Sequence, residues 1–202
     1  MTVPARGSEK FCLTITGPTG PTLGQYGGYI VLTPVDGGRV YRVPFAGFVG
    51  DYQSIPVLLP TANGFPWLAK LAAGTFTNQP SGATFSMQGD DIPFFLVHFE
   101  HQAPRFVPQV TEIKTDKKGV QKKGRNWHKI LDERSFGRNT SPTGFFAFEW
   151  DGETFAGKDD QTFTVPDGQY VVTLSVLKPL GDANDPAHNE IWESPLITID
   201  RP

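Results

Sequence analysis

Two of the chain's four histidines lie three positions apart and are the first candidates for a metal site. The surrounding segment, PFFLVHFEHQ, alternates like a β-strand, and an odd separation places His98 and His101 on opposite faces of a strand. His98 shares a face with Glu100, but two ligands alone hold a metal weakly. We therefore expect ordinary polar groups at the end of a strand here, with no metal bound.

An acidic segment carries oxygen atoms of the kind that glycosidases and calcium sites use. Asp151, Glu153, Asp159 and Asp160 lie close together in the sequence, among glycines. A glycosidase needs a carboxylate pair beside a sugar-binding cleft, and an EF-hand needs ligands at regular alternate positions. Neither pattern is present, so we expect no catalytic acid in this segment.

A second oxygen-rich segment, GDANDPAHNE, spans residues 181–190. Its Asp182, Asn184 and Asp185 are the chain's weak candidates for calcium ligands. Asp and Asn side chains also bond to nearby backbone in turns, so a turn-forming loop is the expected structure. Calcium binding at these three residues stays open as the alternative.

The remaining chemistry-bearing patterns do not complete a catalytic or phosphate-binding site. Cys12 is the single cysteine, so an internal disulfide is impossible, and no His–Asp motif accompanies it as a nucleophile would require. In the Gly-rich stretch VPFAGFVGDYQSIPVLLP, Pro56 and Pro60 follow the glycines where a phosphate-binding helix would lie. We expect no catalytic residue and no cofactor in this chain.

The charge balance argues against nucleic acid as a partner. The formal net charge is −3, so no broad positive field is present. Residues 114–129 do hold seven Lys and Arg, which predicts a solvated loop between strands or, alternatively, a patch for nucleic acid or anionic wall glycans. Trp127 is the one aromatic residue in this run, too few for a stacking platform. No apolar run approaches membrane-spanning length, so we expect no membrane insertion.

Composition and alternation favour β structure. The chain contains 16 Phe, 22 Gly and 18 Pro, and residues alternate with period two in about ten segments. Only 67–74 and 127–137 have any helical character. The expected fold is therefore all-β, an antiparallel β-sandwich of the immunoglobulin or fibronectin type III kind. Its predicted core residues are Phe146, Phe148, Trp150, Tyr170, Val172, Leu174, Val176, Ile197 and Ile199.

The strand pattern pauses across residues 60–82 and resumes strongly near residue 93. We therefore expect a boundary near residue 90. Residues 1–90 would form a partial fibronectin type III-like β module with a loop-rich tail. Residues 91–202 have the length and strand content of one immunoglobulin-like sandwich.

One stretch is specific enough to resemble a known family. GGYIVLTPVDGGRVYRVPFAGFVGDYQ resembles the close of the fibronectin type III-like domain that follows the catalytic domain in large secreted and cell-envelope subtilisin-like proteases. The match is closest at residues 28–30 and 43–52. The later segments FAFEWDG, VPDGQYVVTLSVLKPLGD and WESPLITID look like the immunoglobulin-like domain that comes next in such proteins. They are also similar to the immunoglobulin-like part of flagellar hook-capping proteins.

This resemblance implies an accessory part of a protease rather than the protease itself. The family's Asp-Thr-Gly, His-Gly-Thr and Gly-Thr-Ser-Met-Ala motifs are absent from the chain, so no catalytic residue carries over. The implied roles are architecture, spacing, or docking of protein substrates, outside the cell or at its wall. The implied partners are the parent catalytic domain, a protein substrate, or another copy of the chain. An independent adhesion or glycan-binding module remains the alternative.

Several glycines and aromatic residues are expected to shape interfaces. Gly47 and Gly50 should let the chain turn as it leaves the first module, and Phe45 and Phe48 should fill the seam to the next. Phe65 and Trp67 are either an exposed glycan platform or, more commonly, a plug between domains. Trp150 belongs to the predicted core.

The first module is expected to be incomplete, because only one further strand candidate, FCLTIT, precedes its hairpin. Phe11, Leu13 and Ile15 would then need cover, as would one face of the hairpin at 29–32. Three sources of cover are open: residues 60–90 as a lid against the 91–202 domain, another copy of the chain, or upstream sequence in a parent protein.

Overall fold

The computed structural model describes residues 3, 6–156 and 161–202, and these residues form an all-β fold of packed antiparallel sheets. The predicted fold class is thus confirmed. In these described residues, helix is limited to two 3-10 turns, η1 (Tyr52–Ser54) and η2 (Pro186–His188). The chain divides into two compact units, Met1–Tyr52 (unit 1) and Gln53–Pro202 (unit 2).

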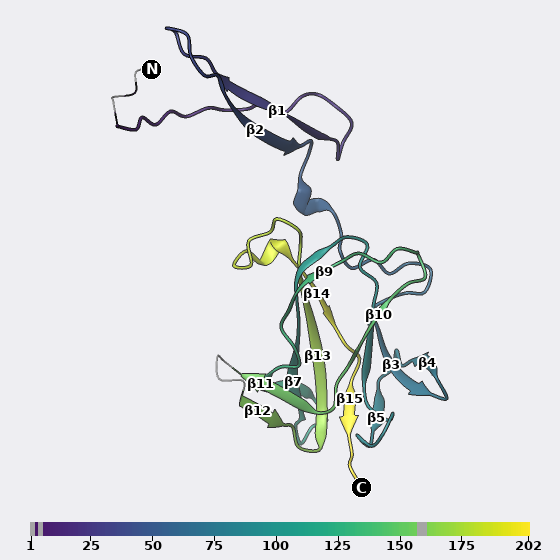
Figure 1. The fold of residues 1–202 in the computed structure, drawn as a ribbon. Helices are drawn as coiled ribbons and strands as arrows, with labels where there is room; N and C mark the ends of the chain where they lie inside the picture. The colour runs from purple at the N-terminus through teal and green to yellow at the C-terminus, as the bar shows by residue number, and fades with distance from the viewer. Residues whose placement is uncertain (1–2, 4–5, 157–160) are drawn as a thin grey trace. The chain divides into compact units, whose positions relative to one another are not determined.

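Unit 2 is a sandwich of two sheets, which face each other in Figure 1. The smaller sheet has the order β10-β6-β3-β4, and the larger has the order β12-β11-β8-β7-β13-β15-β5, with β14 added to β13 and β9 to β7. The smaller sheet comprises β3 (Trp67–Ala72), β4 (Thr75–Asn78), β6 (Phe94–Val97) and β10 (Phe146–Glu149). The larger comprises β5 (Ala83–Phe85), β7 (Ala103–Thr115), β8 (Gln121–Lys129), β9 (Glu133–Phe136), β11 (Glu153–Ala156), β12 (Gln161–Thr164), β13 (Gly168–Leu177), β14 (Asn189–Glu193) and β15 (Ile197–Ile199).

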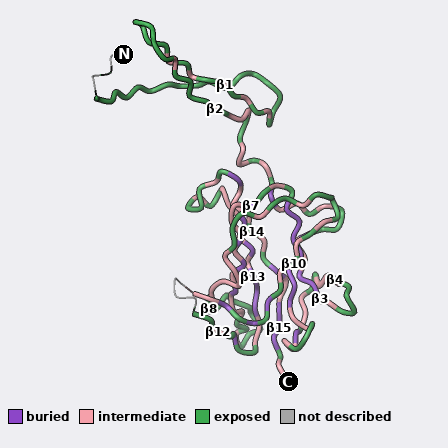
Figure 2. Tube along the Cα trace, in the orientation of Figure 1, coloured by how far each residue is buried: buried purple, intermediate pink, exposed green. Residues whose placement is uncertain are grey.

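The core lies between these sheets, where Figure 2 shows the buried segments. Alternate residues of β13 point inward, and each is fully or almost fully buried. Phe146 and Phe148 of β10 pack against the same cluster from the facing sheet. All nine residues that alternation assigns to the core belong to this cluster or pack against it, so that prediction is confirmed.

The described part of unit 1 consists of one hairpin and irregular chain. β1 (Gln25–Leu32) and β2 (Tyr41–Phe48) pair antiparallel, and Gly37 and Gly38 take positive φ in the loop that joins them. The predicted strand at 11–16 is wrong, because this segment pairs with no strand among the described residues. Phe11 and Leu13 of that segment stay half exposed.

The two units divide earlier in the sequence than the expected boundary near residue 90. The reason is that 67–85 supplies β3, β4 and β5 to the sheets of unit 2, and Leu68 and Phe85 are fully buried in its core. The helical character expected of 67–74 and 127–137 is also not realised. The first segment forms β3, and the second contributes the end of β8 and then β9.

Acid should destabilise unit 2 where Asp91 takes up a proton. Burial alone raises the pKa of Asp91, but hydrogen bonds from Lys70 and Ser86 outweigh it and lower the pKa from 3.8 to about 2. Because the folded-state pKa is the lower one, this stabilisation is present above pH 3.8 and is lost as pH falls through about 2. Urea unfolding across this pH range should show that the free energy of unfolding falls less for Asp91→Asn than for the unaltered protein. Identical pH profiles for the two proteins would contradict the assignment.

Candidate functional site

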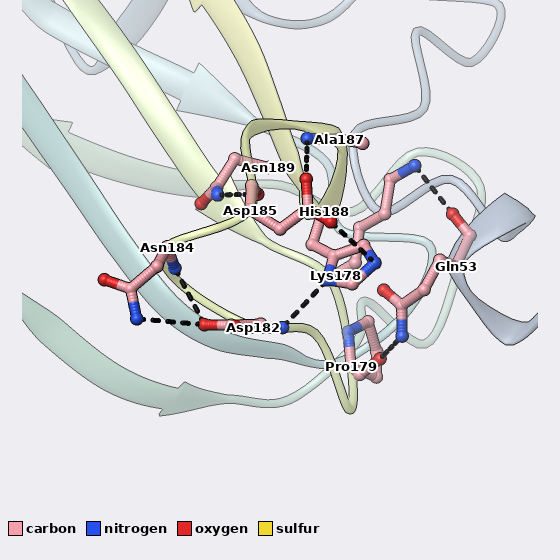
Figure 3. Close-up of polar contacts among 9 residues, drawn as sticks. All are labelled: Gln53, Lys178, Pro179, Asp182, Asn184, Asp185, Ala187, His188 and Asn189. Carbon is pink, nitrogen blue, oxygen red and sulfur yellow. Dashed lines mark hydrogen bonds and ion pairs between the residues drawn. The ribbon is translucent and has the colours of Figure 1, made fainter.

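The 181–190 loop connects β13 to β14 and is held by its own polar side chains (Figure 3). The Asp182 carboxylate accepts hydrogen bonds from the backbone N–H of Asn184 at 2.9 Å and from its side-chain amide at 3.1 Å. Asp185 caps η2 by accepting from the backbone N–H of Ala187 at 2.9 Å. The backbone N–H of Asp182 donates to Nδ1 of His188 at 2.9 Å.

These bonds are those of a turn-forming loop, which is the structure that its Asp and Asn residues predict. Asp182 and Asp185 each bind donors within the loop instead of pointing together at a common centre (Figure 3). Across the part of the chain that the structure describes, no three His, Cys, Asp or Glu side chains gather in a metal-binding group.

The base of the loop is tied to the beginning of unit 2. Lys178 donates through Nζ to the carbonyl of Gln53 at 2.7 Å, and the Gln53 amide donates to the carbonyl of Pro179 at 2.8 Å (Figure 3). The Glu190 carboxylate accepts from the backbone N–H groups of Val57 and Leu58 at 2.8 and 2.7 Å. The loop therefore projects from a fixed base.

A groove lies on the outer face of the larger sheet, between the strands and the 181–190 loop. We call it the outer groove, and its volume is about 410 Å³. Strands β7, β8, β13 and β14 form its floor, and the loop forms one wall. Its lining residues are Arg105, Val107, Gln109, Lys129, Ser175, Ala183, Asn184, Pro186, Asn189 and Ile191.

Two cations of the outer groove share one carboxylate. Arg105 donates to both oxygens of Asp132, through Nε at 2.7 Å and Nη2 at 2.6 Å, and Lys129 donates to Oδ2 at 2.6 Å. The Arg105 hydrogen bond, aided by Lys129 and opposed by burial, holds the pKa of Asp132 well below its usual range. Asp132 therefore stays ionised at neutral pH and keeps the two cationic groups side by side.

His98 and Glu100 contact each other just beyond the end of β6. His98 is 2% exposed, its Nδ1 lies 2.7 Å from the carbonyl of Gly144, and its Nε2 lies 3.3 Å from the Glu100 carboxylate. His98 and Glu100 thus lie on one side of the chain, as the strand pattern predicts. Their contacts satisfy a buried imidazole.

Of the acidic candidates, Asp151 and Glu153 line one pocket of about 270 Å³ together with Glu149. The Asp151 carboxylate accepts from the backbone N–H of Glu153 at 2.9 Å, which closes a local turn. Asp159 and Asp160 lie outside the described residues. Cys12 is exposed and forms no disulfide.

The glycines and aromatic residues of the hairpin behave differently from expectation. Gly47 does not turn the chain; it lies in β2 opposite Tyr26, whose ring occupies the space that a side chain at position 47 would need. Phe45 packs over Gly28, where an added Cβ would lie 3.0 Å from the ring. Gly50 does take a turn conformation, with φ of +102°.

The remaining aromatic candidates are packed. Phe48 contacts Tyr52 edge-to-face at 4.7 Å within unit 1. Phe65 is 3% exposed, its ring lies 5.0 Å from that of Trp67, and the Trp67 indole donates to the carbonyl of Asn63 at 2.8 Å. Phe65 and Trp67 therefore do not form an exposed aromatic row. Trp150 is fully buried, as expected.

The basic run at 114–129 is a strand pair rather than the expected loop. It contains the end of β7 and all of β8, joined by a turn in which Asp116 accepts backbone hydrogen bonds. Lys122 pairs with Asp116 at 3.3 Å, and Lys123 pairs with Glu193. Part of the positive charge is thus neutralised locally.

Within the described residues, no helix has the length and apolar character needed to cross a membrane.

Comparisons with known proteins identified no relative. The chain matches neither a protein-family model nor a curated protein.

Proposed function

We propose that this chain is a non-catalytic accessory module of a subtilisin-like serine protease, acting outside the cell or at its wall. In this role unit 2 is a rigid sandwich that sets spacing or docks protein substrates. The β1–β2 hairpin joins the module to the rest of the protease. The proposal extends the sequence resemblance, whose most specific residues lie in β1, in β2 and in the turn that follows β2.

The observation that carries the proposal is the apolar surface of this hairpin. Its register places Ile30 beside Val43 on one face, whereas Tyr29 and Val31 lie on the other. Tyr29 is 64% exposed, and Val31 and Val43 are each 50% exposed. Apolar side chains therefore meet solvent on both faces of a two-stranded ribbon.

Such a ribbon is at best marginally stable alone, because each strand has one open edge and little apolar area is buried. Additional strands beside its edges and a second sheet against its face would remove both costs. In the proteases that the chain resembles, the matching hairpin closes a fibronectin type III-like sandwich. We infer that protease sequence supplies the missing strands here.

The proposal can be tested in the cells that make the protein. An antibody against unit 2 should precipitate a polypeptide that reacts with a fluorophosphonate, because a serine protease carries the activated serine on which this probe depends. The purified 202-residue chain should neither react with the probe nor cleave casein, since it lacks the triad motifs.

Pretreatment of the precipitate with an unlabelled serine-directed inhibitor provides the control and should abolish the label. A precipitated protein that never reacts with the probe, and brings down no reactive partner, would contradict the proposal. Cleavage by the purified chain, lost when one of its own serines is replaced, would also contradict it.

A further inference from the structure

We propose that the outer groove of unit 2 binds a saccharide that carries a carboxylate, such as a hexuronate unit of an acidic glycan. This inference is independent of the protease proposal, because it rests only on the groove. The argument concerns the floor of the groove, its cations, its unused hydrogen-bonding groups and its apolar contacts.

The floor is a continuous patch of outward-facing side chains. Buried residues of β13 point into the core, so their neighbours Thr173, Ser175 and Leu177 point outward. Strand register then aligns Ser175 with Val107 of β7 and with Ile191 of β14. One step along, Thr173 pairs with Gln109, which in turn pairs with Lys129 of β8.

The two cations come from β7 and β8, on the side of this patch opposite β14. Arg105 and Lys129 line the groove, whereas the carboxylate they share, that of Asp132, does not. Arg105 uses Nε and Nη2 for Asp132, which leaves Nη1, and the Lys129 ammonium has three donors. Two oriented cations with spare donors can hold a second carboxylate beside Asp132.

Neutral polar groups fill the rest of the groove. Neither Gln109 nor Ser175 makes a side-chain hydrogen bond with the described part of the protein, so both are available to a ligand. Asn184 and Asn189 donate their amide protons to the loop, at 3.1 and 3.0 Å, which orients their side chains at the wall. Their carbonyl oxygens are left to accept from ligand hydroxyls.

The two acids of the loop, Asp182 and Asp185, do not neutralise the cations of the groove at close range. Asp182 and Asp185 accept hydrogen bonds from within the 181–190 loop, and neither lines the groove. Figure 3 shows Asn184 pointing away from Gln53 and Pro179, on the side of the loop opposite its anchor. A ligand in the groove would therefore contact the side-chain amides of Asn184 and Asn189 rather than these two carboxylates.

The balance of polar and apolar groups favours a sugar over a peptide side chain. The groove is lined by many hydrogen-bonding side chains, those of Arg105, Lys129, Ser175 and three amides. A saccharide carries enough closely spaced hydroxyl groups to bond with most of them. Val107 and Pro186 supply small apolar contacts for ring C–H groups, and Ile191 is 60% exposed. No large apolar pocket is present among these residues to bury a hydrophobic side chain.

Titration with tetragalacturonate, followed by NMR, tests this site. The side-chain amide signals of Gln109, Asn184 and Asn189 should shift together and saturate. A neutral galactose tetramer should bind at least about tenfold more weakly, because it offers no carboxylate to the two cations. Tetraglutamate, which has the charge without the hydroxyls, should bind about tenfold more weakly as well.

Matched variants separate the groove from the rest of the face. Gln109→Ala should weaken tetragalacturonate binding about fivefold, whereas Gln169→Ala, at the far end of β13, should leave it unchanged. Lys129→Met should weaken binding about tenfold, and Lys123→Met, outside the groove on the same strand, should have little effect. Thermal unfolding would verify that each variant is folded.

Three results would overturn the proposal. One is the absence of any saturable shift with tetragalacturonate. Another is equal binding by folded Gln109→Ala and Gln169→Ala proteins. The third is tetraglutamate binding as tightly as tetragalacturonate, which would indicate recognition of an acidic peptide or of charge alone.

Discussion

Replacing Trp150 with alanine should lower the free energy of unfolding of unit 2 by about 3–5 kcal/mol. Its side chain is fully buried, its indole N–H donates to the carbonyl of Glu153 at 2.9 Å, and its ring meets Tyr170 edge-to-face at 5.9 Å. The substitution would leave a large cavity between the sheets and remove the donor for that carbonyl. Urea unfolding followed by circular dichroism measures the loss.

Trp150→Phe is the control, because it keeps an aromatic ring and removes only part of the volume and the N–H group. Its loss should be clearly smaller than that of Trp150→Ala. If Trp150→Ala unfolds with a loss below about 1 kcal/mol, the cost expected of a buried large-to-small change is missing. Such a result would place Trp150 outside the core.

Gly82→Ala should lower the free energy of unfolding by about 2–4 kcal/mol. Gly82 has φ of +85°, which an alanine adopts only with strain, and an added Cβ would overlap the carbonyl oxygen of Leu196. That carbonyl also accepts from the backbone N–H of Ala83 at 3.1 Å, where β5 begins its parallel pairing with β15. Backbone on both sides leaves little room to relax.

Gly74→Ala separates the strain of a positive φ from the clash with the Leu196 carbonyl. Gly74 has φ of +75°, but nothing lies within 4 Å of the position its Cβ would take. It should therefore show only the conformational cost of about 1–2 kcal/mol. Equal losses for Gly74→Ala and Gly82→Ala would show that the contact with Leu196 contributes nothing.

Alternation in the sequence predicts the core of unit 2 because both sheets have one buried face. Tyr170, Val172 and Leu174 recur at every second position, and only the inward face of β13 can bury them all. The same logic finds Phe146 and Phe148 on β10. These positions follow from local pattern alone.

Residues 67–74 show where local pattern fails. WLAKLAAG is rich in good helix formers, yet it forms β3, because pairing with β4 and β6 buries Leu68 and Ala69 completely. For residues 11–16 the opposite error occurs, since a strand is predicted and none forms. They alternate like a strand, but alternation cannot supply a partner strand, and the described part of unit 1 contains none for them.

The outer groove could not be found from the sequence. Only the 181–190 loop carries a visible signal, since its Asp and Asn residues predict a polar turn. Arg105, Gln109 and Ser175 look like ordinary strand residues, and they meet only through the register of β7 with β13. The sharing of Asp132 by Arg105 and Lys129 depends on the pairing of β7 with β8 and β9.

The central claim is that protease sequence covers the β1–β2 hairpin, and hydrogen exchange of residues 25–48 tests it most directly. The comparison is between the purified chain and the fluorophosphonate-reactive polypeptide recovered from cells, with β13 as an internal reference. We expect these amides to exchange near the unfolded rate in the purified chain, because a lone hairpin is marginal, and to be strongly protected in the recovered polypeptide. Equal exchange of residues 25–48 in the two samples, with β13 protected in both, would contradict the account.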